Sequence, residues 1–256
     1  MRTVLITGAS SGIGAACAIR LRDRGWRVLA GVRREGTAPE GTQELLVDVT
    51  DPPAVKLDGL HGLVNNAGVA VAGPLEFLSA DELRRQLEVN VVGQLRMTQL
   101  CLPALRAARG RVVNMGSISG LNALPLLGAY SMSKFALEAM TDSLRVELEP
   151  WGIHVAIVEP GTIRTPIWTR ERPQPPPEAL ELYGPRLDAF RRLAVRRGTS
   201  GAPPEAVADA VEHALTAEKP KTRYLVGRDA KARARVERLP DRLRDRVIVR
   251  RVLGDA

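Results

Sequence analysis

Four side chains in the middle of the chain have the types that proton-transfer chemistry uses. Tyr130 and Lys134 stand four residues apart at the start of a predicted helix, so they share one face of it. A neighbouring ammonium favours the phenolate and lowers the pKa of a tyrosine, which could then exchange a proton with a substrate hydroxyl near neutral pH. Ser117 follows a predicted strand and could hydrogen-bond the same oxygen. Taken singly, such residues are more often a surface pair and a turn or helix cap.

Asn90 stands within a predicted helix. Asparagine lowers helix propensity, so its presence there indicates a specific role. We expect it to hold a water molecule that links Lys134 to solvent.

A glycine-rich turn lies near the start of the chain. The segment Thr7-Gly-Ala-Ser-Ser-Gly-Ile-Gly14 joins a β-branched run, 3–7, to a predicted helix, 13–24. Glycines let the backbone approach a pyrophosphate, and the helix N-terminus supplies free N–H groups and a positive dipole end. Any tight turn could use glycines, but this placement favours a dinucleotide site. Its expected contacts are Gly8, Ser10, Ser11, Gly12, Ile13 and Gly14.

The second predicted strand ends in two arginines, at a point where an acidic residue would bind the ribose hydroxyls of NAD. Arg33 and Arg34 instead offer charge and paired donors to a 2′-phosphate, so NADP(H) is favoured and NAD(H) stays possible. The alternative is two solvated loop arginines. Asp48 and Val49, at the end of the third strand, are placed to meet the adenine.

Strands and helices alternate along the chain, and this alternation brings the residues above to strand ends. It predicts an α/β fold of the doubly wound Rossmann type, with a parallel seven-stranded sheet covered on both faces. The connections 34–44 and 51–62 are too short or too interrupted for full helices. The stretch 165–203, rich in proline and arginine, is expected to be a mobile substrate loop. The predicted strands are 3–7, 27–32, 44–47, 62–64, 111–115, 154–158 and 224–226, and the main helices are 13–24, 80–108, 131–149 and 204–217.

Read in order, these motifs resemble those of the short-chain dehydrogenases/reductases. The intervals from Asn90 to Ser117 and from Ser117 to Tyr130, 27 and 13, also resemble the family's, whereas the rival Ser119 has an interval of 11. The resemblance implies an oxidoreductase that interconverts an alcohol and a ketone or aldehyde. It rests on Thr7 to Gly14, Asn65-Asn66-Ala67-Gly68, Asn90, Ser117, Tyr130-Ser-Met-Ser-Lys134 and Pro160-Gly161.

The resemblance implies a role for each matching residue. Tyr130 would be the acid/base, Ser117 the stabiliser of the carbonyl oxygen, Lys134 the ribose-binding modulator of the tyrosine pKa, and Asn90 the relay residue. The segment Asn66, Ala67 and Gly68 would line the adenosine side, and Pro160, Gly161 and Ile163 would contact the nicotinamide.

The resemblance extends to assembly and to the tail. The helices 80–108 and 131–149 resemble those that pair subunits, which implies a homodimer or homotetramer. The pattern Tyr224-Leu-Val-Gly227 is similar to bacterial relatives of the retinol and hydroxysteroid dehydrogenases, which often carry extra C-terminal helices. We therefore expect a Rossmann domain over 1–228 and a helical extension over 229–256.

The net charge of +8 is concentrated at the end of the chain, since residues 217–256 hold 13 Lys/Arg and 6 Asp/Glu. Apolar residues there form a stripe at helical spacing, and Pro240 is expected to split the tail into two helices, with Asp241 capping the second. The tail could be a solvated face, a peripheral contact with an anionic membrane, or a cover packed over the cleft or on another subunit. The stripe is Val236, Leu239, Leu243 and Val247.

Composition excludes several other classes. Two cysteines 84 positions apart and three histidines give no metal-ligand spacing and no disulfide scaffold, which favours the cytoplasm. We expect no metal, no signal peptide, no membrane span and, with 4% aromatic residues and no recognition motif, no nucleic-acid partner.

The substrate is expected to be a small alcohol or carbonyl compound. The segments 122–128 and Ile167-Trp168 favour an apolar one. The alternatives are a reductase of carrier-bound 3-oxoacyl groups and a non-enzymatic dinucleotide sensor. The intact Asn–Ser–Tyr–Lys set argues against the sensor.

Overall fold

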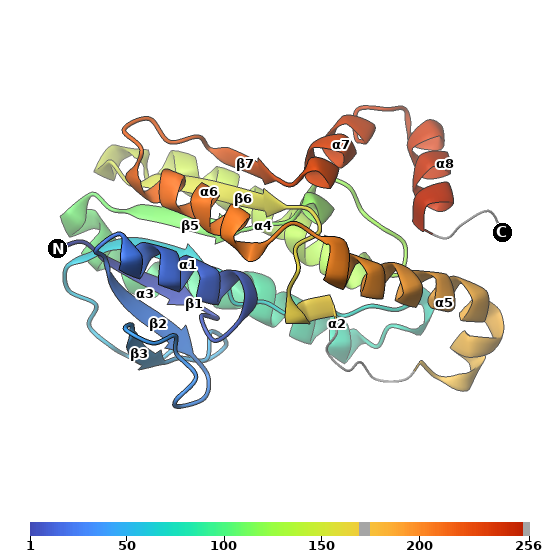
Figure 1. Ribbon diagram of the computed structural model, residues 1–256, viewed down its shortest axis with the longest axis horizontal. Helices are drawn as coiled ribbons and strands as arrows, with labels where there is room; N and C mark the ends of the chain where they lie inside the picture. Colours follow the sequence, from blue (N-terminus) through green and yellow to red (C-terminus); the bar gives the residue numbers. More distant parts are fainter. Residues whose placement is uncertain (169–174, 253–256) are drawn as a thin grey trace.

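The sheet has seven parallel strands in the order β3-β2-β1-β4-β5-β6-β7, which confirms the predicted Rossmann-type fold (Figure 1). The computed structural model describes residues 1–168 and 175–252. The strand order reverses between β1 and β4, and at such a point an open parallel sheet forms a ligand crevice at its carboxyl edge. The strands are β1 Thr3–Thr7, β2 Arg27–Val32, β3 Gln43–Leu46, β4 Leu60–Asn65, β5 Arg111–Met115, β6 His154–Pro160 and β7 Arg223–Val226.

Helices cover both faces of the sheet. The helices α1 and α6 lie side by side on one face, and α3 and α4 pack on the other. The helices are α1 Gly12–Asp23, α2 Ala80–Leu87, α3 Gly93–Ala108, α4 Gly128–Glu147, α5 Pro177–Ser200, α6 Pro204–Thr216, α7 Arg228–Val236 and α8 Asp241–Val252, with short 3₁₀ turns η1 Leu75–Phe77, η3 Ile118–Gly120, η4 Glu149–Trp151 and η5 Pro166–Trp168.

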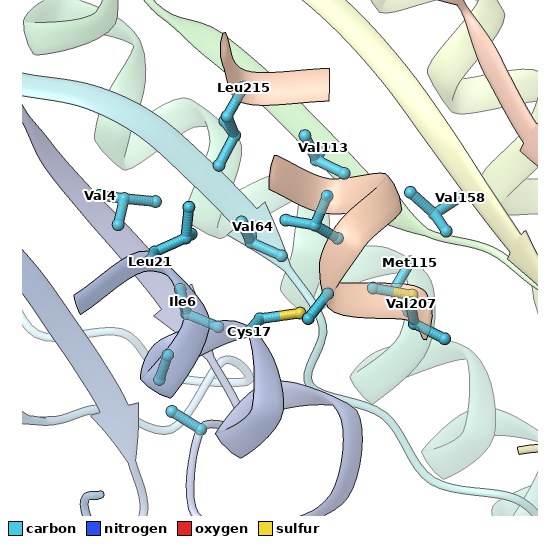
Figure 2. Close-up of a cluster of buried hydrophobic side chains, with 14 of the residues drawn as sticks. Val4, Ile6, Cys17, Leu21, Val64, Val113, Met115, Val158, Val207 and Leu215 are labelled. Atoms are coloured by element: carbon cyan, nitrogen blue, oxygen red, sulfur yellow. The ribbon is translucent and has the colours of Figure 1, made fainter. Parts of the chain in front are cut away.

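Two apolar cores follow from the period of two along each strand. In β1, Val4 and Ile6 face the helices α1 and α6, where they meet Cys17 and Leu21 (Figure 2), whereas Leu5 faces α3 and α4. Every residue of β1 is buried, because a central strand of a covered parallel sheet has no solvent side. Each strand is thereby fixed in register, and the loops at its carboxyl end are held in fixed positions.

The predicted truncation of the crossovers beside β3 is confirmed. The described residues 33–42 and 47–59 contain no helix, and β3 is partly exposed at the edge of the sheet. The strands β4 and β6 are longer than predicted, and β3 begins one residue earlier. The helix predicted over 80–108 is interrupted by a π-helical turn, η2 Glu88–Val92, that contains Asn90.

The prediction that 165–203 is a loop is wrong for most of its length. The helix α5 occupies Pro177–Ser200, with Pro185 inside it, while the proline-rich part at 169–174 lies outside the described residues. Buried side chains recur along α5 at helical spacing, namely Ala179, Leu187, Phe190 and Ala194. This periodicity outweighs the proline and arginine content on which the loop prediction depended.

The tail forms the two predicted helices, broken at Pro240, but it packs differently from the prediction. Leu239 and Leu243 of the predicted stripe are 38% and 48% exposed. The helix α8 instead packs through Ile248 and Val252 against the apolar cluster that includes α5. Asp241 is the first residue of α8 and not its cap, since the carbonyl of Pro240 accepts the first N–H groups.

Arg223 of β7 ties the edge of the sheet to its neighbours. Its guanidinium pairs with Glu159 of β6 at 3.1 Å, with Asp142 of α4 at 2.9 Å, and with Glu138 of α4. Glu138 and Glu159 are both buried, and burial raises the pKa of both carboxyls despite the guanidinium.

A raised pKa in the folded state predicts a pH-dependent stability. A carboxyl that binds its proton more tightly when folded stabilises the fold at acidic pH, and that stabilisation is lost as the pH rises through the folded pKa. For Glu159 the interval runs from 4.5 to about 7. In Glu159→Gln, we expect the free energy of unfolding from urea titrations to fall less across this interval than in the unmodified protein. The exposed control Glu181→Gln should keep the original slope, and equal slopes in all three proteins would contradict the prediction.

Candidate active site

One cleft of about 640 Å³ runs along the carboxyl edge of the sheet and collects nearly all the predicted site residues. At one end lie Arg33, Arg34 and Asp48, and at the other lie Ser117, Tyr130 and Lys134. Among the predicted residues, Gly14 alone does not line the cleft in the part of the chain that the structure describes. The remaining wall residues are Gly8, Ser10, Ser11, Gly12, Ile13, Val49, Asn66, Ala67, Gly68, Asn90, Pro160, Gly161 and Ile163.

The glycine turn between β1 and α1 has the backbone shape that a phosphate cradle needs. Gly8 and Gly12 have φ values of +66° and +58°, in the left-handed region that favours glycine. A Cβ at Gly14 would lie 2.2 Å from the carbonyl oxygen of Gly8, so this position supports the turn from beneath. Ser11 stands at the cap position of α1 but makes no side-chain cap, and the first turn has no acidic residue. The N-terminus of α1 therefore remains able to bind an anion.

The end of β4 holds this turn in place. The Thr7 hydroxyl accepts hydrogen bonds from the N–H groups of Asn66 and Ala67, both at 3.0 Å. The Asn66 amide donates back to the carbonyls of Thr7 and Gly8, at 2.9 and 3.2 Å. Asn66 therefore acts on the cofactor cradle through the backbone of the turn.

The opposite end of the cleft is basic and open. Arg33 and Arg34 are exposed on its rim. One carboxylate oxygen of Asp48 accepts from the N–H and the hydroxyl of Thr50, at 2.9 and 2.7 Å. These bonds lower the pKa of Asp48, and the charge of Arg33 lowers it further.

A row of buried amides, which the sequence analysis did not identify, supports the cleft floor. Gln86, Asn90 and Gln94 are each four residues apart across α2, η2 and α3. They hydrogen-bond the backbone of 67–71, the irregular segment that follows β4. The spacing of four in the sequence indicates that the three amides share one helix face. It does not indicate which backbone segment they bind.

Asn90 accepts from the N–H of Val69 at 2.8 Å and donates to its carbonyl at 3.0 Å and to the Ser133 hydroxyl at 3.0 Å. These bonds give a reason for an asparagine within the helical run. The side chain is occupied by protein groups, and the relay role stays a prediction.

The reactive groups meet at the end of β5. Ser117 is the cap residue of η3, and its hydroxyl accepts from the N–H of Ser119 at 3.1 Å and is a hydrogen-bond partner of the Tyr130 phenol. The ammonium of Lys134 lies 5.6 Å from the centre of the Tyr130 ring and donates to the Met115 carbonyl at 2.6 Å. A carbonyl oxygen held here would face a phenol and a hydroxyl at once.

The expectation that Lys134 lowers the pKa of Tyr130 is not met in the protein alone. Burial raises the pKa of Tyr130, and the bond to Ser117 and the charge of Arg233 only oppose that rise. Burial also lowers the pKa of Lys134 to about 8, against an attraction from Glu138 that raises it. Desolvation disfavours both charged forms. At this end of the cleft the Tyr130 phenol therefore keeps its proton, and the Lys134 ammonium loses its proton more readily than in water.

The turn after β6 closes the same end of the cleft. Gly161 donates to the Val226 carbonyl at 2.9 Å, and the Thr162 carbonyl accepts from Ala202 at 2.9 Å. The tail also reaches the cleft, because Arg233 of α7 is one of its wall residues. The sequence analysis expected a tail contribution to the pocket but did not identify this arginine.

Residues 1–168 and 175–252 were compared with the requirements of a metal site and of a membrane-spanning helix. No group of three or more His, Cys, Asp or Glu side chains is placed to hold a metal ion. No helix in these ranges is both long and apolar enough to cross a membrane.

Residues 2–176 match the family model of the short chain dehydrogenases. The chain is 40% identical to retinol dehydrogenase 5 of Mus musculus, over 89% of this chain and 81% of the relative. It is 36% identical to an NADPH-dependent 3-dehydrocapnine reductase of Ornithobacterium rhinotracheale, over 96% of each chain. A short chain dehydrogenase from Burkholderia cenocepacia J2315, solved in complex with NADP, superposes with a TM-score of 0.76 at 28% identity, covering 99% of this chain and 100% of that one.

Proposed function

Because this chain belongs to the short-chain dehydrogenase family, as an oxidoreductase acting on CH–OH groups near the retinol dehydrogenases, we propose that it interconverts an apolar alcohol and its ketone or aldehyde with NADP(H). The observation that carries the proposal is the cleft, which joins a dinucleotide cradle to Ser117, Tyr130 and Lys134. The glycine turn has the shape for a pyrophosphate and the rim carries the arginines for a 2′-phosphate, so the residues fit the dinucleotide.

In the proposed mechanism, the substrate oxygen binds between the Ser117 hydroxyl and the Tyr130 phenol. The bound dinucleotide supplies the hydride in reduction and takes it in oxidation. As the carbonyl carbon gains a hydride, Ser117 stabilises the negative charge that develops on the oxygen, and Tyr130 transfers its proton to it. Lys134 stabilises the phenolate that remains, and Asn90 is proposed to support the return of a proton from solvent.

The electrostatics of the cleft favour an acid role for Tyr130. Burial raises its pKa, so the phenol stays protonated at neutral pH and is ready to donate. In the oxidising direction the phenolate is required, and the positive charge of oxidised nicotinamide together with Lys134 would favour it. We therefore propose reduction as the direction for which the site is better prepared.

Replacing Tyr130 by phenylalanine removes the proton donor and keeps the ring. We expect Tyr130→Phe to lower kcat by at least about 100-fold, while the Kd for NADPH stays within a few-fold, because general acid catalysis contributes a factor of this size. Tyr183→Phe, a tyrosine of α5 that does not line the cleft, is the control and should keep its rate. Steady-state kinetics with a panel of apolar ketones and aldehydes measures both, and a near-normal rate in Tyr130→Phe would refute the assigned role.

The preference for NADP(H) is supported by Arg33 and Arg34 on the rim and by the lack of an acid at the end of β2. One relative is named as NADPH-dependent and one similar structure contains NADP, which agrees with this preference. NAD(H) stays a possible second cofactor. Asn66, Ala67 and Gly68 line the same cleft, which supports the cofactor contacts proposed for 66–68.

We expect NADPH to bind more tightly than NADH, by roughly 10- to 150-fold, because a charge-assisted contact contributes about 1.5–3 kcal/mol. The double variant Val32→Asp with Arg33→Ala should reverse the order, since it adds an acceptor for the ribose hydroxyls and removes the phosphate ligand. Fluorescence titration of both cofactors measures the four dissociation constants. Equal constants for the unmodified protein would rule the preference out.

We propose that the protein works in the cytoplasm. Cys17 and Cys101 are buried free thiols, and burial raises the pKa of each to about 12, which suits a reducing cytoplasm. Leu239, just before α8, and Leu243 of α8 are exposed among arginines and could touch an anionic membrane. The packing of α8 against α5 favours the role of a cover, and the extension 229–256 is therefore proposed to be part of the catalytic unit.

We propose that the protein is a homodimer or homotetramer that pairs through the helical run 80–108, which comprises α2, η2 and α3, and through α4. The outward side of α4 carries the exposed apolar residues Met132, Phe135 and Val146, which a subunit contact would cover.

Light scattering should give two or four times the chain mass of 27.8 kDa at micromolar concentration. Phe135→Asp places a charge in the proposed contact and should shift the protein toward the monomer, whereas Leu182→Asp, on the exposed side of α5, should not. A monomer in the unmodified protein would contradict the proposed assembly.

A further inference from the structure

The helix α7 docks onto the body of the protein through polar groups. Asp229, Arg233 and Glu237 are spaced by four and therefore share one face of the helical segment. Asp229 accepts from the N–H of Thr162 at 2.7 Å, Arg233 donates to the carbonyl of Asn122 at 2.6 Å, and the Asn122 amide donates to Glu237 at 3.0 Å. Figure 1 shows α7 directly after β7, at the carboxyl edge of the sheet.

Two glycines make room for the carboxylate of Asp229. A Cβ at Gly161, which follows β6, would lie 2.2 Å from one carboxylate oxygen, and a Cβ at Gly227, which follows β7, would lie 2.8 Å from the same oxygen. Gly227 also has a φ of +102°, in the region that other residues rarely adopt. Any larger side chain at 161 would displace Asp229, so the ends of two strands leave a space that this one side chain fills.

The backbone group that Asp229 holds lies in the wall of the cleft. Thr162 stands between Gly161 and Ile163, at the end where Tyr130 lies and away from Arg33. If the substrate oxygen binds Tyr130, the reacting ring of the dinucleotide must lie beside it, and therefore against this turn. The carbonyl of Thr162 is held by Ala202, so the N–H bonded to Asp229 is the second fixed point of the same residue.

We propose that Asp229 is a positioning residue that fixes the turn 160–163 for the nicotinamide half of the cofactor, which makes α7 part of the cofactor site. The inference rests on the proposed function for the placement of the nicotinamide. A carboxylate bonded to a backbone N–H makes a strong, oriented hydrogen bond, because the acceptor is charged. The competing explanation is that Asp229 only stabilises the first turn of α7 by its charge.

The test compares a whole dinucleotide with its adenosine half. Binding of NADPH and of 2′,5′-ADP is measured by calorimetry for the unmodified protein, Asp229→Ala, Asp229→Asn and Asp229→Glu. We expect Asp229→Ala to raise the Kd for NADPH about tenfold, which is the effect of losing one charge-assisted hydrogen bond. The Kd for 2′,5′-ADP should stay within about twofold. Asp229→Asn keeps an acceptor oxygen and should restore most of the affinity. Asp241→Ala, an exposed acid in the first turn of α8, is the control and should change neither.

Asp229→Glu separates positioning from helix stabilisation. It keeps the charge in the first turn of α7, but its longer side chain does not fit between Gly161 and Gly227, so we expect weaker NADPH binding with 2′,5′-ADP unchanged. Normal NADPH affinity in Asp229→Glu or in Asp229→Ala would overturn the inference, as would equal weakening of both ligands. If Asp229→Ala does not fold, the Asn and Glu variants still decide.

Failure of the proposed function would be seen separately. An unmodified protein that turns over no alcohol or ketone refutes the reaction but leaves the binding comparison intact. If the unmodified protein prefers NADH, the same comparison is made with NADH and ADP.

Discussion

Backbone groups beyond the carboxyl edge of the sheet have no neighbouring strand, and the cleft depends on how their hydrogen bonds are satisfied. Asn66 does this for the glycine turn, Thr7 and the amides of Gln86, Asn90 and Gln94 do it for 66–71, and Asp229 does it for the turn after β6. Each loop is thus held by side chains from another element. The walls of the cleft are consequently fixed by long-range contacts, although the residues that line it stand in loops.

Burial of the reactive end has a second effect, which is electrostatic. Desolvation disfavours the charged forms of both Tyr130 and Lys134, so the pKa of the phenol rises, the pKa of the ammonium falls to about 8, and the two values move apart. The phenol therefore keeps its proton, whereas the ammonium gives up its proton more readily than in water. Glu138, one helical turn beyond Lys134, limits this effect because its charge favours the ammonium.

Much of the fold and of the site could be predicted from the sequence, because the strand pattern and the glycine and tyrosine motifs are local. The parallel sheet follows from the alternation of strands and helices, and most predicted wall residues line one cleft. Three features could not be predicted in this way. The amide row binds a segment that no local pattern identifies, α5 was hidden by its proline and arginine content, and the tail was interpreted from its apolar residues although α7 docks through Asp229, Arg233 and Glu237. In each case the outcome depended on partners distant in the sequence.

The short connections beside β3 have a consequence for the kinetics of the cofactor. The described residues 33–42 and 47–59 contain no helix, so neither segment places a helix over the basic end of the cleft. A dinucleotide bound there would be enclosed at the turn after β6 and open to solvent at its adenosine end, so it would enter and leave by way of that end. When an oxidoreductase exchanges its cofactor between turnovers, the direction of its reaction depends on the dinucleotides dissolved around it. The ratio of reduced to oxidised dinucleotide would then set the direction in which the same side chains work.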